Sequence, residues 1–172
     1  MKFSVVIPIF NGEKFVKACL DSLANQDFDL NEFEVLVVND CSTDNTKQAI
    51  ANYMENNLTL DIQLFNQEKN KGKGAAIHKA IELATGEFLI IQDADLEYDP
   101  NEFNVLLQPI VTGFADVVYG SRFMGGNPHR ILFYWHSIGN QFLAKLSNMF
   151  TNLNLTDMET CYKMIDTKIA QA

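Results

Sequence analysis

The strongest constraint on this chain is a regular alternation between short β-branched runs and longer amphipathic segments. Strand-like runs occur at residues 3–9, 33–38, 60–65, 87–92 and 115–120. Apolar side chains at helical spacing occur between them, at residues 13–25, 43–57, 73–85 and 100–112. Such alternation is typical of βαβ units, whose strands run parallel. The sequence therefore predicts an α/β fold with a mainly parallel sheet flanked by helices.

Length, charge and cysteine content narrow the class of protein. With 172 residues, 47% of them apolar, residues 1–172 are expected to form a single domain. A net charge of −9 argues against nucleic acid or an anionic membrane as a partner held by bulk electrostatics. The three widely spaced cysteines suit neither a disulfide framework nor a zinc site, which favours a reducing, cytoplasmic location. Neither a signal peptide nor a membrane span is predicted, and peripheral membrane contact through a surface patch stays open.

The segments that follow the strands are rich in polar and charged residues, and ligands of parallel sheets bind at the carboxyl ends of the strands. The fourth such segment carries Asp93, Asp95 and Glu97 at alternating positions. These acids would repel one another unless a cation lay between them, and oxygen ligands favour Mg²⁺ or Mn²⁺. The spacing of two aspartates is not specific by itself, because Asp27 and Asp29 repeat it in a predicted solvated loop.

Helix capping accounts for several of the other polar residues. Ser42 or Thr43 is a good N-cap for the second helix, and Asp44 complements its dipole. Asp99, followed by a proline, is predicted to cap the fourth helix. Asp40 is left over at the end of its strand, which makes it a candidate for ligand contact.

The glycines of NKGKGAAI allow two interpretations. They could let backbone N–H groups approach a phosphate at the start of the third helix, or they could form a loose turn. A dinucleotide-binding fingerprint is not expected, because its sixth-position glycine is missing and the segment follows the third strand.

Five segments, taken in order, resemble one known family. VVIPIFNGE, VLVVNDCSTDNT, NKGKGAAIHKAIELATGEFLIIQDADLEYDP, VVYGSRF and NLNLTDMETCYKM are similar to a family 2 glycosyltransferase of the GT-A fold, nearest the dolichyl- or polyprenyl-phosphate sugar transferases. The resemblance implies a nucleotide-sugar donor, of the UDP-glucose or GDP-mannose type, held with Mg²⁺ or Mn²⁺. It also implies inverting transfer to a polyprenyl or dolichyl phosphate. Relatives usually continue for some tens of residues beyond DTKIAQA, so the domain is expected to be truncated at its C-terminus.

Carried over residue by residue, the resemblance implies three groups of side chains. The nucleotide site would comprise Pro8, Phe10, Glu13, Asp40, Lys71, Gly74 and Asp93. The metal would be held by Asp93, Asp95 and Glu97. Catalysis would rest on Asp95, Arg122 and Asp157, with Arg122 stabilising the leaving diphosphate and Asp157 positioning the acceptor or acting as a base. The acceptor would lie near Ser121, Arg130 and Glu159.

The acceptor side allows two interpretations of residues 125–150. Arg130 could meet a lipid phosphate while the nearby aromatic residues lean on a membrane interface. Alternatively, the segment is an amphipathic helix packing on the sheet, which we favour for the aromatic residues.

Three other functions stay open at this point. One is transfer to a glycan hydroxyl in cell-surface polysaccharide synthesis, which would need a general base, whereas a lipid phosphate is already ionised. The second is a sugar nucleotidyltransferase, although FNGEKF is a poor version of its glycine-rich loop. The third is a non-catalytic nucleotide-binding module.

Overall fold

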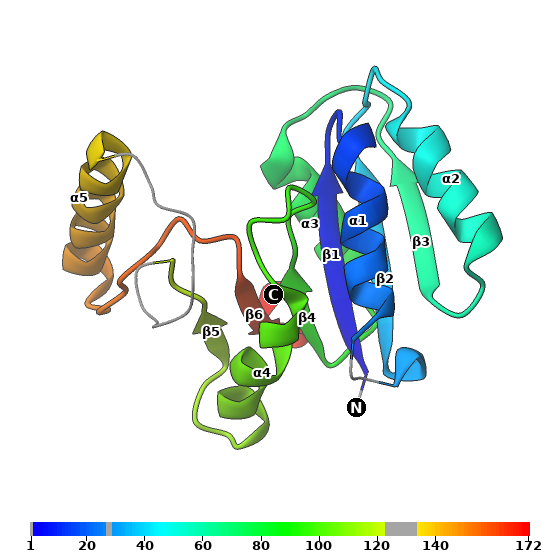
Figure 1. The fold of residues 1–172 in the computed structure, drawn as a ribbon. Helices are drawn as coiled ribbons and strands as arrows, with labels where there is room; N and C mark the ends of the chain where they lie inside the picture. The colour runs from blue at the N-terminus through cyan, green and yellow to red at the C-terminus, as the bar shows by residue number, and fades with distance from the viewer. Residues whose placement is uncertain (1, 27–28, 123–133) are drawn as a thin grey trace.

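The computed structural model describes residues 2–26, 29–122 and 134–172 (Figure 1). The strands within these ranges are β1 (Phe3–Ile9), β2 (Phe33–Asn39), β3 (Asp61–Asn66), β4 (Phe88–Ile91), β5 (Val117–Tyr119) and β6 (Lys163–Asp166). They form a single sheet in the order β3-β2-β1-β4-β6-β5. The first four strands are parallel to one another, and β6 runs antiparallel between β4 and β5. The predicted mainly parallel sheet is confirmed.

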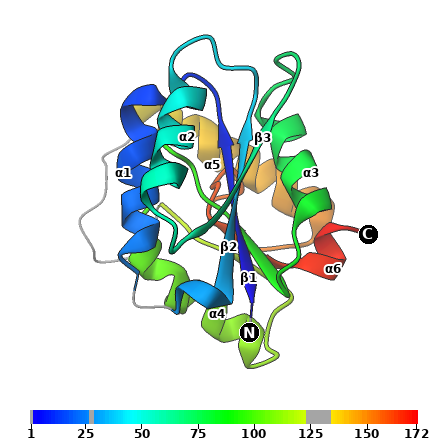
Figure 2. The same cartoon turned by 90° about the vertical axis from the view of Figure 1, so that its right-hand side faces the viewer.

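Helices flank this sheet on both sides, and one further helix lies away from it (Figure 1 and Figure 2). The helices are α1 (Glu13–Ala24), α2 (Thr46–Asn56), α3 (Lys73–Leu83), α4 (Phe103–Val111), α5 (Tyr134–Thr151) and α6 (Thr167–Ala170), with short 3₁₀ turns η1 (Leu30–Glu32) and η2 (Pro100–Glu102). Figure 2 shows α1 and α2 on one side of the sheet and α3 with α6 on the other. The four predicted helices are present, and β6 was not predicted.

Alternating side chains on β1 and β2 build a separate core on each face of the sheet. Val5 and Ile7 pack with α1 and α4 side chains, whereas Val6, between them, packs with the alanines of α3. Along β2, Val35 and Leu36 divide in the same way. Parallel strands covered on both faces carry apolar residues on both faces, which explains why these strands lack a regular polar alternation.

β1 contains a proline although it is a central strand. The last backbone bond to the β4 side runs from Gln92 N to Val6 O over 2.9 Å, so the polar groups of Val6 point toward β4. Two positions later Pro8 points the same way, where β4 has already ended, so its missing N–H leaves no ladder bond unmade. The next residue, Ile9, still accepts from Asp40 N over 2.9 Å on the side of β2. The sheet therefore opens between the carboxyl ends of β1 and β4.

The helix α5 stands apart from the sheet (Figure 1). Its apolar side chains Trp135, Phe142 and Phe150 are exposed. The interpretation that this segment packs on the sheet is therefore wrong for the described residues, because α5 lies away from the strands (Figure 1). None of the helices in the described ranges is long and apolar enough to cross a membrane.

A buried glutamate joins three segments at the amino ends of the strands. Glu34, only 1% exposed, accepts hydrogen bonds from Ser4 Oγ (2.7 Å) and Thr85 N (2.7 Å) on Oε1 and from Gln63 Nε2 (3.2 Å) on Oε2. Burial acts to raise the pKa of Glu34, but the hydrogen bonds from Ser4 and Thr85, with Lys2 nearby, outweigh it and lower the pKa from its ordinary value of 4.5. The carboxylate thus fixes the turn before β4 against β1 and β2.

We expect substitutions of Glu34 to destabilise the fold in a defined order. Glu34→Leu leaves the Thr85 N–H and the Ser4 hydroxyl without an acceptor, so the free energy of unfolding should fall by about 2–4 kcal/mol. Glu34→Gln keeps one acceptor oxygen and should lose only about 1 kcal/mol. Urea unfolding at neutral pH measures both changes, and equal stability of wild type and Glu34→Leu would contradict the proposed role of this network.

The same network predicts a pH dependence. Because the pKa of Glu34 is lower in the folded than in the unfolded chain, its stabilising contribution is complete above the ordinary value of 4.5. The contribution is lost as the pH falls through the folded-state pKa. Urea unfolding across this acidic range should show that loss in wild type and a smaller loss in Glu34→Gln.

Candidate functional site

A cavity of about 300 Å³ lies at the opening between β1 and β4. Its lining comes from the ends of β1, β2 and β4 and from the starts of α1 and α3: Pro8, Ile9, Phe10, Asn11, Gly12, Phe15, Asp40, Lys73, Ala76, Asp93, Ala94 and Asp95. The order of strands reverses at this point, and open α/β sheets bind ligands at such a crevice. Five of the residues predicted for the nucleotide and the metal, Pro8, Phe10, Asp40, Asp93 and Asp95, thus lie together.

A second hollow, of about 470 Å³, lies at the amino edge of β2 and β3. Its lining is mainly apolar and amide side chains, with Asp61 as the charged one. Because it lacks the neighbouring carboxylates and the lysine of the other cavity, we place the candidate site at the carboxyl edge of the sheet.

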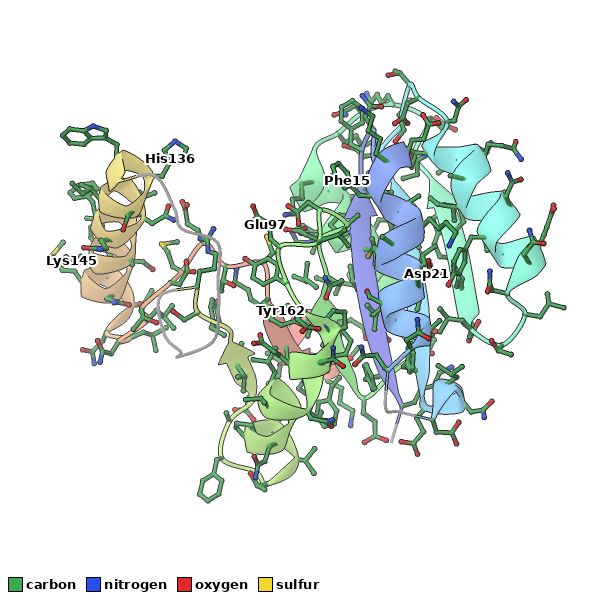
Figure 3. All side chains as sticks on the ribbon, viewed as in Figure 1. Phe15, Asp21, Glu97, His136, Lys145 and Tyr162 are labelled. Atoms are coloured by element: carbon green, nitrogen blue, oxygen red, sulfur yellow. The ribbon has the colours of Figure 1, made fainter. Side chains whose placement is uncertain are left out.

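Two phenylalanines give the cavity an aromatic side. Phe10, at the end of β1, is 50% exposed, and Phe15, on the first turns of α1, is 45% exposed. Figure 3 shows Phe15 on α1 near the carboxyl end of β1. Half-exposed aromatic rings at the opening of a cavity can stack against a planar ligand such as a nucleobase.

The loops after β1 and β2 are bonded to each other. Asn11 N donates to Ser42 Oγ over 2.9 Å, and Asn11 Oδ1 accepts from Thr43 N over 2.8 Å. Glu13 accepts from Asn45 Nδ2 over 3.0 Å. The carboxylate of Glu13 is therefore bonded to the neighbouring loop, and the residue is not among those that line the cavity.

The predicted capping of α2 by Ser42 or Thr43 is wrong. The helix begins later, at Thr46, and the Asp44 carboxylate accepts from Thr46 N over 3.0 Å. Ser42 and Thr43 instead bond the loop after β1, so tertiary contacts prevail over the local capping preference. The prediction for Asp99 is confirmed, since its side chain accepts from the N–H two residues on, at the start of η2.

Asp40 holds the loop that leads into α3. It is 2% exposed, and its two oxygens accept from Lys71 N (2.8 Å) and Gly72 N (2.7 Å). Gly72 has φ +86°, a left-handed conformation that suits glycine. A Cβ added at Gly74 would meet nothing within 4 Å, so the backbone there is open to a ligand. Of the loop residues predicted to bind nucleotide, Lys71 and Gly74 lie beside the cavity lining rather than in it.

The acidic residues after β4 differ in their contacts and exposure. Lys73 Nζ contacts both Asp93 oxygens, at 2.6 and 2.7 Å, while Asp95 is exposed and accepts from Glu97 N over 3.1 Å. Glu97 lies toward the side of the molecule that carries α5 (Figure 3). Leu96, between the two acids, has φ +63°, an unfavourable conformation for leucine that is often retained at functional sites.

No group of three or more metal-ligating side chains gathers within the described ranges, so Asp93, Asp95 and Glu97 do not form a closed cage. The two aspartates that share the cavity still fit a hard cation. Mg²⁺ is commonly bound by one or two carboxylates together with substrate phosphates and water, rather than by a complete set of protein ligands. The residues therefore fit a cation that a diphosphate ligand helps to hold.

A second group of predicted residues gathers around Arg122. Its Nε and Nη2 bond the two oxygens of Asp157 over 2.7 and 2.9 Å. With its amide oriented to satisfy both neighbours, Asn140 of α5 donates to Glu159 Oε2 over 2.7 Å and accepts from Arg122 Nη2 over 3.3 Å. Ser121 Oγ accepts from Thr156 Oγ1 over 2.9 Å. Arg130, the remaining predicted acceptor residue, lies outside the described residues.

The Arg122–Asp157 pair is strongly electrostatic. Burial acts to raise the pKa of Asp157, but its bonds to Arg122 outweigh burial and lower that pKa from 3.8. The same bonds raise the pKa of Arg122. A carboxylate held in this way is a weak proton acceptor, and its geometry favours orienting the guanidinium.

Sequence reasoning missed Phe15, Lys73 and Cys161 as neighbours of the site. Phe15 and Lys73 line the cavity, and Lys73 Nζ lies 2.8 Å from Cys161 Sγ. Phe15 and Lys73 lie on helices, and the helical periodicity of the sequence does not indicate which helical side chains face a ligand. Only the order of the strands, which brings β6 beside β4, places Cys161 here.

Comparison with known proteins identifies close relatives of this chain. The family model described as "Glycosyl transferase family 2" matches residues 4–172. The poly(ribitol-phosphate) beta-N-acetylglucosaminyltransferase TarS of Staphylococcus aureus is 44% identical over 95 residues, covering 55% of this chain and 16% of TarS. The dolichol-phosphate mannosyltransferase of Pyrococcus furiosus is 30% identical over 126 residues, covering 73% of this chain and 34% of that protein. The chain thus spans a minor part of either relative.

Solved structures share the fold. The crystal structure of S. aureus TarS 1-349 superposes with a TM-score of 0.69 at 30% identity, covering 98% of this chain and 48% of that one. The mannosyltransferase PcManGT from Pyrobaculum calidifontis, in complex with GDP-Man and Mn²⁺, gives a TM-score of 0.56 at 31% identity over 59% of this chain and 29% of its own. The expected GT-A fold class is confirmed. A family match over nearly all of its residues, carried by this sheet and its strand-end loops, shows that the chain belongs to glycosyl transferase family 2.

Proposed function

We propose that residues 1–172 act as a single donor-binding domain that holds a nucleotide-sugar and Mg²⁺ or Mn²⁺ for inverting transfer to a polyprenyl or dolichyl phosphate. The observation that carries this proposal is the cavity itself, in which the aromatic rings of Phe10 and Phe15 share one opening with Asp93 and Asp95. An aromatic surface suits the base, and the carboxylates suit a cation bound to the diphosphate.

The chemistry follows from where charge would develop. When bound, the cation would neutralise the charge that gathers on the departing nucleoside diphosphate. Arg122, fixed by Asp157, would present a permanent positive charge toward the same group. A phosphate acceptor is already ionised near neutral pH, so transfer to it needs no side chain as a general base. This agrees with Asp157 being held as an ion-pair partner.

The relatives support the donor more than the acceptor. TarS has been solved with UDP and with UDP-GlcNAc, and PcManGT with GDP-Man and Mn²⁺. These ligands belong to those proteins, and they favour a nucleotide-sugar and a divalent cation here. The match to dolichol-phosphate mannosyltransferase favours a lipid phosphate as acceptor.

Transfer to a glycan or polyol hydroxyl is the second candidate. The relative with 44% identity over 95 residues is named for transfer to poly(ribitol-phosphate), a hydroxyl-bearing polymer. In that case a general base is required. Incubation with UDP-GlcNAc and each acceptor class, followed by mass analysis of the product, separates the two candidates.

A lipid acceptor would require the protein to contact the membrane, and we propose that it is cytoplasmic and binds the membrane peripherally. The exposed apolar side chains of α5, such as Trp135 and Phe142, are compatible with such contact.

Asp95→Ala is expected to abolish metal-dependent nucleotide binding without unfolding the domain. Asp95 is exposed and makes a single local bond to Glu97 N, so the free energy of unfolding should change by no more than about 0.5 kcal/mol. Calorimetric titration of UDP and GDP with and without Mn²⁺, on wild type and Asp95→Ala, measures the loss and identifies the base.

Glu55→Ala is the matched control, because it removes an exposed carboxylate from α2, away from the cavity. It should bind as wild type does. Binding that is independent of Mn²⁺ and of Asp95 would refute the metal site, and release of pyrophosphate in place of nucleoside diphosphate would indicate a nucleotidyltransferase.

Arg122 and Asp157 are expected to act as a unit. Arg122→Lys keeps the charge but cannot form two parallel bonds, and Asp157→Asn keeps the shape but removes the charge. Each variant should lower kcat by roughly 10- to 100-fold, and the double variant should lose little more than either single one. If Asp157 is instead a general base, Asp157→Asn should be far more damaging than Arg122→Lys and should change the pH profile of kcat.

A further inference from the structure

The Lys73–Asp93 ion pair occupies the position where the proposed function needs a cation. Lys73 is the first residue of α3, and its Nζ contacts both Asp93 oxygens, at 2.6 and 2.7 Å. The Asp93 side chain is 13% exposed, whereas that of Lys73 is 47% exposed. A half-exposed ammonium thus covers a carboxylate that is nearly buried in the cavity wall.

A divalent cation and this ammonium cannot share the same two oxygens. Both are positively charged, so either one, when bound to Asp93, would repel the other at close range. Entry of the cation therefore requires Lys73 to leave the carboxylate. The cost of displacing the ammonium lowers the affinity for the cation when it binds alone.

The displaced ammonium has a favourable place to go. Lys73 lines the same cavity as the aspartates and lies at the N-terminus of α3, where backbone N–H groups also favour an anion. Gly72 and Gly74 flank it, and added side chains at either position would meet nothing within 4 Å. The neighbourhood is open enough for the Lys73 side chain to turn toward a diphosphate.

We propose that Lys73 is a positioning residue that couples the cation to the nucleotide, pairing with Asp93 until the cation takes that carboxylate and then pairing with the donor diphosphate. This inference rests on the proposed function of the cavity. It predicts that the cation and the nucleotide each strengthen the binding of the other, since linkage between two sites is reciprocal. It also predicts that Lys73 weakens the binding of the cation alone and strengthens the binding of the nucleotide when the cation is present.

The test measures Mn²⁺ and UDP binding separately and together. Lys73→Met removes the ammonium and keeps a side chain of similar length. It should bind Mn²⁺ alone more tightly, by about three- to tenfold, in electron paramagnetic resonance of free Mn²⁺. In calorimetry with saturating Mn²⁺, it should bind UDP more weakly by a similar factor. Lys73→Arg, which keeps the charge, should restore much of the coupling.

Lys79→Met is the control of equal charge change. Lys79 lies on the same helix and pairs with Glu82 over 3.1 Å, away from the cavity lining, so this variant should match wild type with both ligands. The inference would be overturned if Lys73→Met left the coupled binding unchanged or lost affinity for both ligands. Either result would leave the proposed function of the cavity standing. If wild type binds neither Mn²⁺ nor UDP, the proposed function fails and the inference fails with it.

Discussion

The parallel pairing of β1 with β2 on one side and with β4 on the other is the constraint on which the site depends. β1 pairs with β2 along its whole length but with β4 only over Phe3–Val6. The sheet is therefore closed at its amino end and open at its carboxyl end. Ser4 and Gly86 hold the closed end, because Gly86 N donates to Ser4 Oγ over 3.0 Å and a Cβ at Gly86 would lie 2.6 Å from the Phe3 backbone. The cavity at one edge thus follows from close backbone contact at the other.

Periodicity predicted the parallel strands and the helices that cover them, because both depend on local alternation. The general rule that parallel sheets bind ligands at their carboxyl edge then indicated where to seek the site. β6 could not be predicted, since Lys163–Asp166 is too short to show a period and its place beside β4 is set by the rest of the sheet. Strand-end residues such as Asp93 were found because their position follows from the strand itself. Phe15 and Lys73 were missed because the direction of a helical side chain depends on how the helix packs.

Arg122 and Lys73, both at this edge, are each bound by an aspartate, but the two pairs differ in kind. Arg122 makes parallel bonds to Asp157, which is 1% exposed, and a planar fork held on a buried carboxylate is fixed in orientation. Lys73 is a point charge on a flexible stem, half exposed, whose contact with Asp93 has no comparable geometry to lose. In a chain of net charge −9, an anionic ligand must meet local positive charge. The Arg122–Asp157 pair is suited to hold its positive charge in a fixed orientation. The Lys73–Asp93 pair is suited to release its positive charge to a ligand.

The loops at this edge also differ in how firmly they are held. Asn11 and Cys41 have positive φ angles of 51° and 58°, and the bonds of Asn11 to Ser42 and Thr43 hold the loops after β1 and β2 together without a ligand. The loop after β4 instead carries a strained leucine between two exposed acids, Asp95 and Glu97. A ligand entering the cavity therefore meets a preformed wall on the side of β1 and β2. On the side of β4, its binding energy can go into neutralising carboxylates and releasing Lys73, which is where a cation and a diphosphate would have to act together.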